Sequence, residues 1–169
     1  MRPMSDQRIE VSRAIAATPS EVFAIVSSPE GHVAIDASGM LMSASGDRAT
    51  AVGDVFTVHM DREALNDFPL GLYDVGVRIT EFEQDRRIAW TIESAFLQPS
   101  IGHVYGYEIE EIPEGCVVTQ FYDWSGIHEQ YRETISFPIV PESALRATLG
   151  ILARTVAPGM PRPILDGSA

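Results

Sequence analysis

Alternation of polar and apolar positions dominates the middle of the chain. Between residues 40 and 125, apolar side chains recur mostly at every second position, as is typical of strands that bury one face. In residues 73–80 one face carries Tyr, Val, Val and Ile, and the other carries Asp, Gly, Arg and Thr. Turn-forming residues separate the segments. The pattern predicts six successive strands in an antiparallel meander, at residues 40–44, 54–60, 73–82, 87–94, 103–110 and 116–124.

The segment before this meander predicts a strand followed by a buried helix. Residues 8–16 alternate in the same way and form a first strand. Thr18 then caps a helix, with Pro19 at its first position and Glu21 placed to complete a capping box. Residues 22–26 are apolar throughout, so this helix has almost no polar side and should be largely buried. A second short helical piece follows through Ile35.

One long amphipathic helix is predicted at residues 141–157. Leu145, Leu149, Leu152 and Val156 form a single apolar stripe along it. An antiparallel sheet must bury its apolar face, and this helix is the obvious cover. A bent sheet around one helix would leave a hollow between them. Interior glycines at Gly76 and Gly106 are expected to mark strong curvature.

Composition and charge narrow the class of protein. The chain has 169 residues, of which 45% are hydrophobic and 21% charged, consistent with one domain at residues 8–157. We expect a disordered N-terminus at residues 1–7 and a Pro/Gly-rich tail at residues 158–169. The net charge of −12 disfavours nucleic acid and anionic membranes as partners. No apolar segment is long enough to insert into a membrane, and no signal peptide is recognised. A cytoplasmic location is therefore expected.

The inventory of reactive side chains excludes several chemistries. All 12 basic residues are arginines, so a lysine Schiff base and a phosphate-binding P-loop lysine are impossible. The single Cys116 excludes an internal disulfide and a cysteine-rich zinc site. His59 and His103 lack partners at metal-binding spacing, and no nucleotide-binding motif occurs. The sequence therefore predicts no metal and no cofactor.

Several segments together resemble a known family. They are "RIEVSRAIAATPSEVFAIVSSPEGH", "VGDVFTVHM", "ITEFEQDRRIAW", "GYEIEEIPEGCVVTQFYDWS" and "LRATLGILARTV". They resemble the START/Bet v 1-like helix-grip (SRPBCC) superfamily, in its polyketide cyclase/dehydrase and lipid transport branch, and "IDASGM" and "YDWS" are similar to an actinobacterial subset. The resemblance implies an α+β helix-grip fold, in which a curved seven-stranded antiparallel sheet holds the C-terminal helix around a hydrophobic cavity. Carriers and cyclases share this fold, so it does not name a reaction.

Three residues are candidates for catalysis. His32 and Asp36 could form a polar pair at one end of the hollow, able to hydrogen-bond a ligand carbonyl or to move a proton. Tyr105 is the third candidate. In the competing interpretation, Asp36 makes a local Asx turn with Ser38 and Gly39, and His32 is a surface residue.

The candidate ligand-binding residues are apolar or aromatic. They are Phe23, Phe56, Phe68, Leu72, Tyr105, Tyr107, Tyr122, Trp124, Leu145, Leu149 and Leu152. The aromatic members could form a stacking wall or simply fill the core, whereas Trp90 is expected in the core. The segment from Leu65 to Leu72 is more apolar than an ordinary loop, and it predicts either a lid over the hollow or a cluster packed on the sheet edge.

These observations favour a protein that binds a small hydrophobic molecule of lipid-like or polycyclic, polyketide-like type. It would act as a carrier or as a cofactor-independent cyclase or dehydratase, and whether turnover occurs is left open. The alternative is a protein-interaction module, chaperone-like or antitoxin-like, with a filled core and an exposed apolar patch. A homodimer is compatible with each of these functions.

Overall fold

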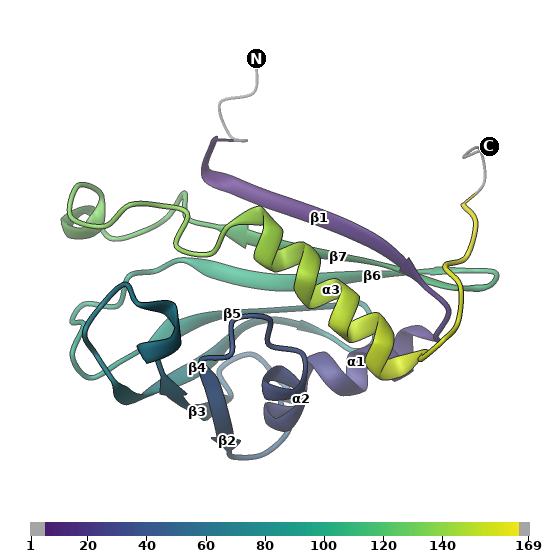
Figure 1. Cartoon of the computed structure of the whole chain (residues 1–169), viewed down its shortest axis with the longest axis horizontal. Coiled ribbons are helices and arrows are strands. Elements are labelled where there is room, and N and C mark those ends of the chain that lie inside the picture. The colour runs from purple at the N-terminus through teal and green to yellow at the C-terminus, as the bar shows by residue number, and fades with distance from the viewer. Residues whose placement is uncertain (1–5, 166–169) are drawn as a thin grey trace.

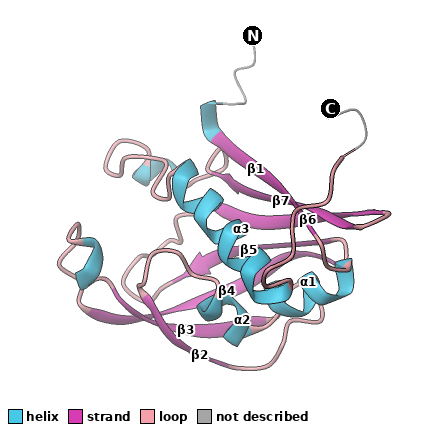
Figure 2. Cartoon of the chain, turned by 45° about the vertical axis from the view of Figure 1, so that its right-hand side comes forward, coloured by secondary structure: helices cyan, strands magenta, loops and turns pink. Residues whose placement is uncertain are grey.

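Seven strands form one curved antiparallel sheet, with the helices on one side of it (Figures 1 and 2). The computed structural model describes residues 6–165. The strands are β1 (Arg8–Ile15), β2 (Leu41–Ser45), β3 (Val55–Asp61), β4 (Leu72–Glu83), β5 (Arg87–Glu93), β6 (Val104–Ile112) and β7 (Gly115–Asp123). The helices are α1 (Pro19–Val26), α2 (Pro29–Ala34) and α3 (Glu142–Val156). The predicted α+β architecture and every predicted strand and helix are present, with ends displaced by at most two residues.

The order of strands across the sheet follows directly from the meander. It is β1-β7-β6-β5-β4-β3-β2, so β2 to β7 lie beside their neighbours in sequence and β1 pairs with β7. Tight turns join β4 to β5 and β6 to β7, longer connections join the other successive strands, and β1 forms the edge of the sheet beside β7. No helix within residues 6–165 is long and apolar enough to cross a membrane.

The predicted capping box begins α1. Thr18 accepts a hydrogen bond from the backbone N–H of Glu21 at 3.1 Å, and the Glu21 carboxylate accepts one from the Thr18 N–H at 2.9 Å. Helix α2 follows at once and packs closely on α1, because Gly31 has no side chain. A Cβ atom at Gly31 would overlap the carbonyl oxygen of Ile25. This close approach holds α2 beside the sheet, where it contributes to the functional site.

Neither interior strand glycine marks a β-bulge, and their expected part in the curvature of the sheet stays a prediction. The register is regular through Gly76 and Gly106, and it shifts instead between Leu41 and Ser43 and between Ile79 and Glu81. Gly106 makes room for the ring of Phe121, which a Cβ atom would overlap. That ring lies on the outer face of the sheet, and the guanidinium groups of Arg8 and Arg87 lie 4.3 and 4.9 Å from its centroid.

Helix α3 covers only part of the sheet. It packs against β1, β7 and α1, and it buries Leu145, Leu149 and Leu152. The helix therefore does not lie along strands β3, β4 and β5 for its whole length. This diagonal placement leaves space between the sheet and the N-terminal part of α3.

The structure describes only part of the two terminal segments that were expected to lie outside the domain. Residues 1–5 of the expected disordered segment and residues 166–169 of the tail lie outside them. Gln7 belongs to the expected disordered segment, yet its carbonyl accepts a hydrogen bond from the N–H of Trp124 at 2.9 Å. Residues 158–165 contain no helix or strand.

Candidate functional site

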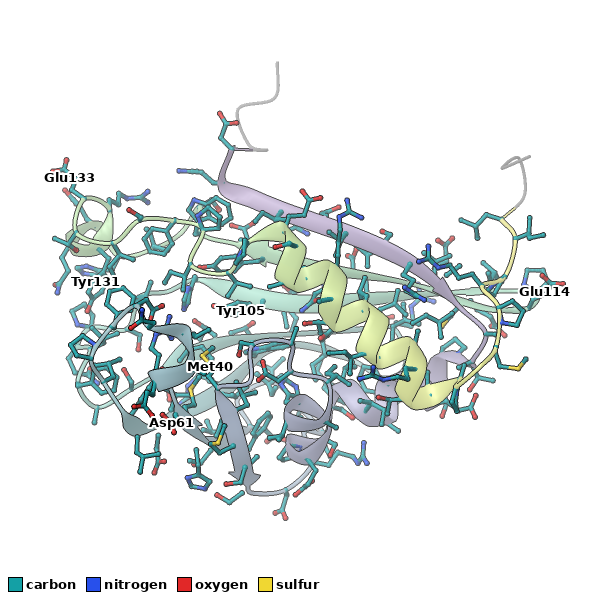
Figure 3. All side chains as sticks on the ribbon, in the orientation of Figure 1. Met40, Asp61, Tyr105, Glu114, Tyr131 and Glu133 are labelled. Atoms are coloured by element: carbon teal, nitrogen blue, oxygen red, sulfur yellow. The ribbon has the colours of Figure 1, made fainter. Side chains whose placement is uncertain are left out.

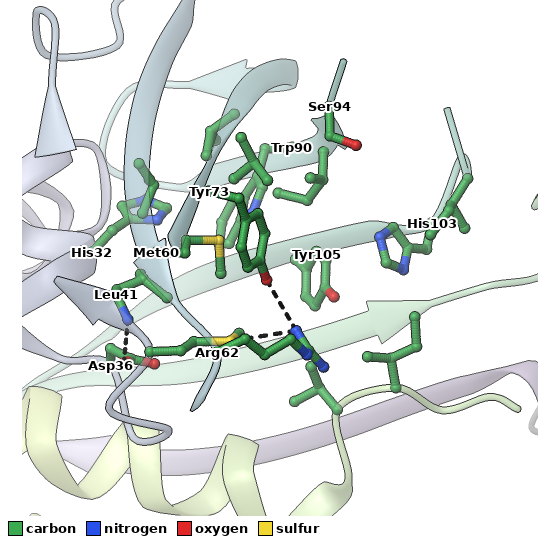
Figure 4. Close-up of a pocket in the computed structure, with 18 of the residues that line it drawn as sticks. His32, Asp36, Leu41, Met60, Arg62, Tyr73, Trp90, Ser94, His103 and Tyr105 are labelled. Carbon is green, nitrogen blue, oxygen red and sulfur yellow. Dashed lines mark hydrogen bonds between the residues drawn. The ribbon is translucent and has the colours of Figure 1, made fainter. Parts of the chain in front are cut away.

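A cavity of about 460 Å³ lies between the sheet and the N-terminal half of α3. Its wall is formed by α2, the α2–β2 connection, strands β2 to β7, the β3–β4 and β5–β6 connections, the segment that leads into α3, and α3 itself. Tyr105 and Met40 lie toward the middle of the molecule, whereas Glu114 and Glu133 mark opposite ends (Figure 3). The close-up shows His32 and Asp36 on one side of the cavity and His103 on the other (Figure 4).

Four of the expected ligand-binding residues line this cavity: Phe68, Tyr105, Tyr107 and Leu145. The other seven do not, and their expected placement is corrected: Phe23, Phe56, Leu72, Tyr122, Trp124, Leu149 and Leu152. All of these except Leu72 are buried in the core, beyond the wall or under the part of α3 that packs directly on the sheet.

Leu72 differs because its side chain is 79% exposed. It has the opposite strand parity to Tyr73 and Val75, which both line the cavity. Successive strand residues point to opposite faces, so Leu72 points away from the interior.

His32 lies in the cavity wall and not on the outer surface. Its Nε2 atom is 2.8 Å from the carbonyl oxygen of Val26. A carbonyl can only accept, so Nε2 carries the hydrogen and Nδ1 is left as an acceptor. The ring makes edge contacts with Trp90 and Phe56, at centroid distances of 4.7 and 5.1 Å. Burial lowers the pKa of His32 to about 4, so the imidazole is neutral near pH 7.

Asp36 makes the local turn expected from the sequence and also lies in the cavity wall, but it makes no hydrogen bond to His32 among the described residues. Its carboxylate accepts hydrogen bonds from Ser38 N–H (3.1 Å), Ser38 O–H (2.8 Å), Gly39 N–H (2.8 Å) and Leu41 N–H (3.2 Å). This is the local Asx turn. Asp36 nevertheless lines the cavity. Four donors from the chain already satisfy the carboxylate, so Asp36 is held in place and compensated locally.

An aromatic layer crosses strands β5, β6 and β7. Trp90, Tyr105 and Tyr122 are directly paired across the sheet. Trp90 and Tyr105 stack at 5.9 Å, and Tyr105 and Tyr122 stack at 4.5 Å. Trp90 lines the cavity, so it is more than a core residue. Burial, with a smaller contribution from Tyr122, raises the pKa of Tyr105 well above its ordinary value, and the hydroxyl therefore stays protonated.

His103 is a cavity residue that the sequence analysis treated as isolated. It is 4% exposed, and its Nδ1 atom is 2.8 Å from the hydroxyl of Tyr122. Burial lowers the pKa of His103 to about 4. The sequence did carry a signal for this position. His103 lies two residues before Tyr105, and in a strand that begins at residue 103 the two side chains point to the same face.

Arg62 is the second cavity residue that sequence reasoning missed. It is 8% exposed, and its Nη1 donates to the hydroxyl of Tyr73 at 3.2 Å. Its Nε and Nη2 donate to the two carboxylate oxygens of Asp67, each at 2.8 Å. Strand parity could have found it, because Arg62 continues the inward series of Val58 and Met60.

The β3–β4 connection is fastened to the cavity by this arginine. Phe68 and Leu70 line the cavity, while remaining 50% and 40% exposed. The Arg62 guanidinium lies 5.2 Å from the centroid of the Phe68 ring. The segment therefore forms a wall at the edge of the cavity, whether or not it moves. Within residues 6–165, no three His, Cys, Asp or Glu side chains are grouped so as to hold a metal ion.

Comparisons with known proteins give the same fold. A protein from Rhodobacter sphaeroides is 15% identical, with a TM-score of 0.65 over 92% of this chain and 95% of that chain. An AHSA1-like protein from Aeromonas hydrophila is 16% identical, with a TM-score of 0.61 over 88% and 91% of the two chains. The Aha1 dimer from Colwellia psychrerythraea is also 16% identical, with a TM-score of 0.59 over 88% and 95%. No curated protein sequence matches this chain significantly.

The family is established by a sequence model. The model described as "Polyketide cyclase / dehydrase and lipid transport" matches residues 6–157, which is nearly the whole described domain. Membership of the narrower actinobacterial subset stays a prediction. The sheet, the long helix and the matched residues agree, and the chain belongs to the polyketide cyclase/dehydrase and lipid transport family, within the START/Bet v 1-like helix-grip (SRPBCC) superfamily.

Proposed function

We propose that this protein binds a small hydrophobic molecule in the cavity and acts as its carrier. The cavity itself is the observation that supports this most strongly. Its volume of about 460 Å³ falls in the range of small-molecule sites, and aliphatic and aromatic side chains form most of its wall. Lipid-like and polycyclic, polyketide-like molecules are the classes that such a wall suits.

Catalysis by a cyclase or dehydratase mechanism is the second candidate. It is favoured by the hydrogen bond between His103 and Tyr122, because His103 lines the cavity and the Tyr122 ring stacks on that of Tyr105. Such a group could hold a proton near a bound ligand. His32 and His103 have low pKa values, and Asp36 is already bonded by four donors. These groups are poor bases at pH 7, and the balance therefore favours the carrier over the enzyme.

A protein-interaction module is less well supported, since it requires a filled core. We further propose a cytoplasmic location, which the free, buried thiol of Cys116 suits. A homodimer, the form named for the Colwellia Aha1 structure, is proposed only as a state to be measured by analytical ultracentrifugation.

Native mass spectrometry of protein purified from its own host tests the carrier proposal. We expect a co-purifying small molecule that is retained in the wild type and lost in Val75→Phe, because Val75 lines the cavity. Val55→Phe is the matched control, since Val55 is 45% exposed and lies outside the cavity wall. Retention of the same molecule by a folded Val75→Phe variant would show that it binds elsewhere. Conversion of the extracted molecule on incubation with fresh protein would favour the enzyme.

A further inference from the structure

Gln120 is a buried amide to which no residue between 6 and 165 offers a side-chain hydrogen bond. It lies in the middle of β7, is 7% exposed and lines the cavity. Its Oε1 atom is fully buried and unbonded, and within residues 6–165 no hydrogen bond reaches its side-chain nitrogen. Buried polar groups are nearly always paired, and an unpaired one is destabilising. An apolar side chain of similar size would fill this position without that cost.

The residue directly opposite Gln120 presents a second unpaired polar group. Tyr107 on β6 is paired with Gln120 in the sheet register, and it also lines the cavity. Its side chain is 3% exposed, and its hydroxyl has no hydrogen bond to any described residue. Side chains directly opposite each other on antiparallel strands lie close together. Gln120 and Tyr107 therefore project into the cavity from directly paired positions, and the Asp36 carboxylate is the charged group that acts on Tyr107.

The charged groups on the wall constrain what this pair could bind. Among the described lining residues only Asp36 and Arg62 carry a full charge near pH 7. Four donors from its own turn satisfy the Asp36 carboxylate, and Asp67 holds the Arg62 guanidinium by two hydrogen bonds. A carboxylate or phosphate head group would thus enter an apolar cavity without a free cation to balance it, which is costly.

We propose that Gln120 and Tyr107 bind a hydroxyl group of a neutral hydrophobic ligand, and so select an alcohol or phenol over a hydrocarbon or a carboxylate. This inference rests on the proposed function and names the ligand chemistry of the same cavity. An amide offers both a donor and an acceptor, exchanged by a half-turn of its terminal bond, and a tyrosine hydroxyl offers both as well. A ligand hydroxyl can donate to one of these residues while accepting from the other. A carboxylate could accept from both residues, but it would bring an unbalanced charge into the cavity.

Fluorescence titration with three pyrene derivatives tests this preference. The probes are 1-hydroxypyrene, 1-methylpyrene and 1-pyrenecarboxylate, which share a ring system and differ in one substituent. We expect the wild type to bind 1-hydroxypyrene about tenfold more tightly than 1-methylpyrene, with 1-pyrenecarboxylate weakest. In Gln120→Met, which keeps the volume and removes the amide, the ratio of the first two affinities should fall toward one. The affinity for 1-methylpyrene should change by less than about threefold.

Thr155→Val is the matched control. The Thr155 hydroxyl donates to the carbonyl of Ile151 at 2.7 Å, and the residue is exposed and lies outside the cavity wall, so its loss should leave the ratio unchanged. Tyr107→Phe provides a second variant, and it should also lower the ratio. The melting temperature of unliganded Gln120→Met should equal or exceed that of the wild type, because an unpaired buried amide is removed.

The outcomes separate this inference from the proposed function. A wild-type ratio near one, or a ratio that persists in both Gln120→Met and Tyr107→Phe, overturns the hydroxyl site and leaves the hydrophobic carrier intact. Tighter binding of 1-pyrenecarboxylate overturns the selection for a neutral ligand. Absence of saturable binding by all three probes overturns the carrier proposal itself.

Discussion

Arg62 and Asp67 form a two-point ion pair across the base of the β3–β4 connection, with both nitrogen–oxygen distances at 2.8 Å. The arginine side chain is 10% exposed and the aspartate side chain 39% exposed. The pair joins the last inward position after β3 to the segment that carries Phe68 and Leu70 into the cavity wall. One salt bridge thus holds an apolar segment against the site and neutralises a buried cation.

Asp67→Asn should destabilise the protein, because the nearly buried guanidinium loses its counter-charge. We expect a loss of about 1–2 kcal/mol in the free energy of unfolding, less than for a fully buried pair because Asp67 is partly exposed. Urea unfolding at pH 7 measures it. Asp47→Asn, at an exposed position, is the control and should change little. Equal stability of the wild type and Asp67→Asn would mean that water compensates Arg62 fully.

The β3–β4 connection should act as a lid. If so, amides of residues 63–71 should exchange hydrogen more slowly when 1-hydroxypyrene is bound, because an occupied cavity adds contacts to Phe68 and Leu70. Hydrogen exchange with mass spectrometry measures this directly. The β6–β7 turn near Glu114 lies far from the cavity and serves as the internal reference (Figure 3). Slower exchange in the cavity strands without any change in residues 63–71 would identify the segment as a packed cluster.

Acid should weaken the fold through His32 and His103, which both lie in the cavity wall. Burial lowers the pKa values of His32 and His103 to about 4, below the ordinary value of about 6.5 in the unfolded chain. The unfolded state therefore binds more protons between these pH values. The free energy of unfolding therefore keeps the full contribution of both neutral histidines above pH 6.5. It falls as the pH drops toward 4, by up to about 1.4 kcal/mol per pH unit for each histidine.

Urea unfolding at several pH values between 7 and 4 checks this dependence. His103→Asn should make the decline shallower, since one titrating group is removed. His128→Asn, at an exposed position, should leave the slope as in the wild type. An unchanged slope in His103→Asn would mean that His103 is protonated equally easily in both states.

Gly31→Ala should be destabilising because α1 and α2 touch at this residue. A methyl group there would overlap the carbonyl oxygen of Ile25, so one helix must move. We expect a loss of about 1–3 kcal/mol, as for other overpacked positions. Gly126→Ala is the control, since no atom lies within 4 Å of the added carbon and its backbone is not left-handed. Thermal unfolding compares the two, and equal melting temperatures would contradict the close contact.

Much of the fold could be predicted because local rules decide it. Alternation of polar and apolar residues predicts the strands, the Thr18–Glu21 capping box predicts the start of α1, and the stripe of leucines predicts α3. The residues that line the cavity are harder to predict. Phe68, Tyr105, Tyr107 and Leu145 were placed on the hollow in advance, whereas Arg62, His103 and Gln120 were overlooked although strand parity could have suggested them.

The sequence by itself determined which side chains share a face, because the periods of a strand and a helix are properties of the backbone. It could not decide which part of a face borders the cavity. Leu145 and Leu149 lie on the same stripe of α3, yet only Leu145 faces open space, because the helix crosses the sheet diagonally and its later turns pack directly on β1, β7 and α1. Strand parity turns Gln120 and Tyr107 inward, but only tertiary packing left their side chains in the cavity wall with no hydrogen bond from the described residues.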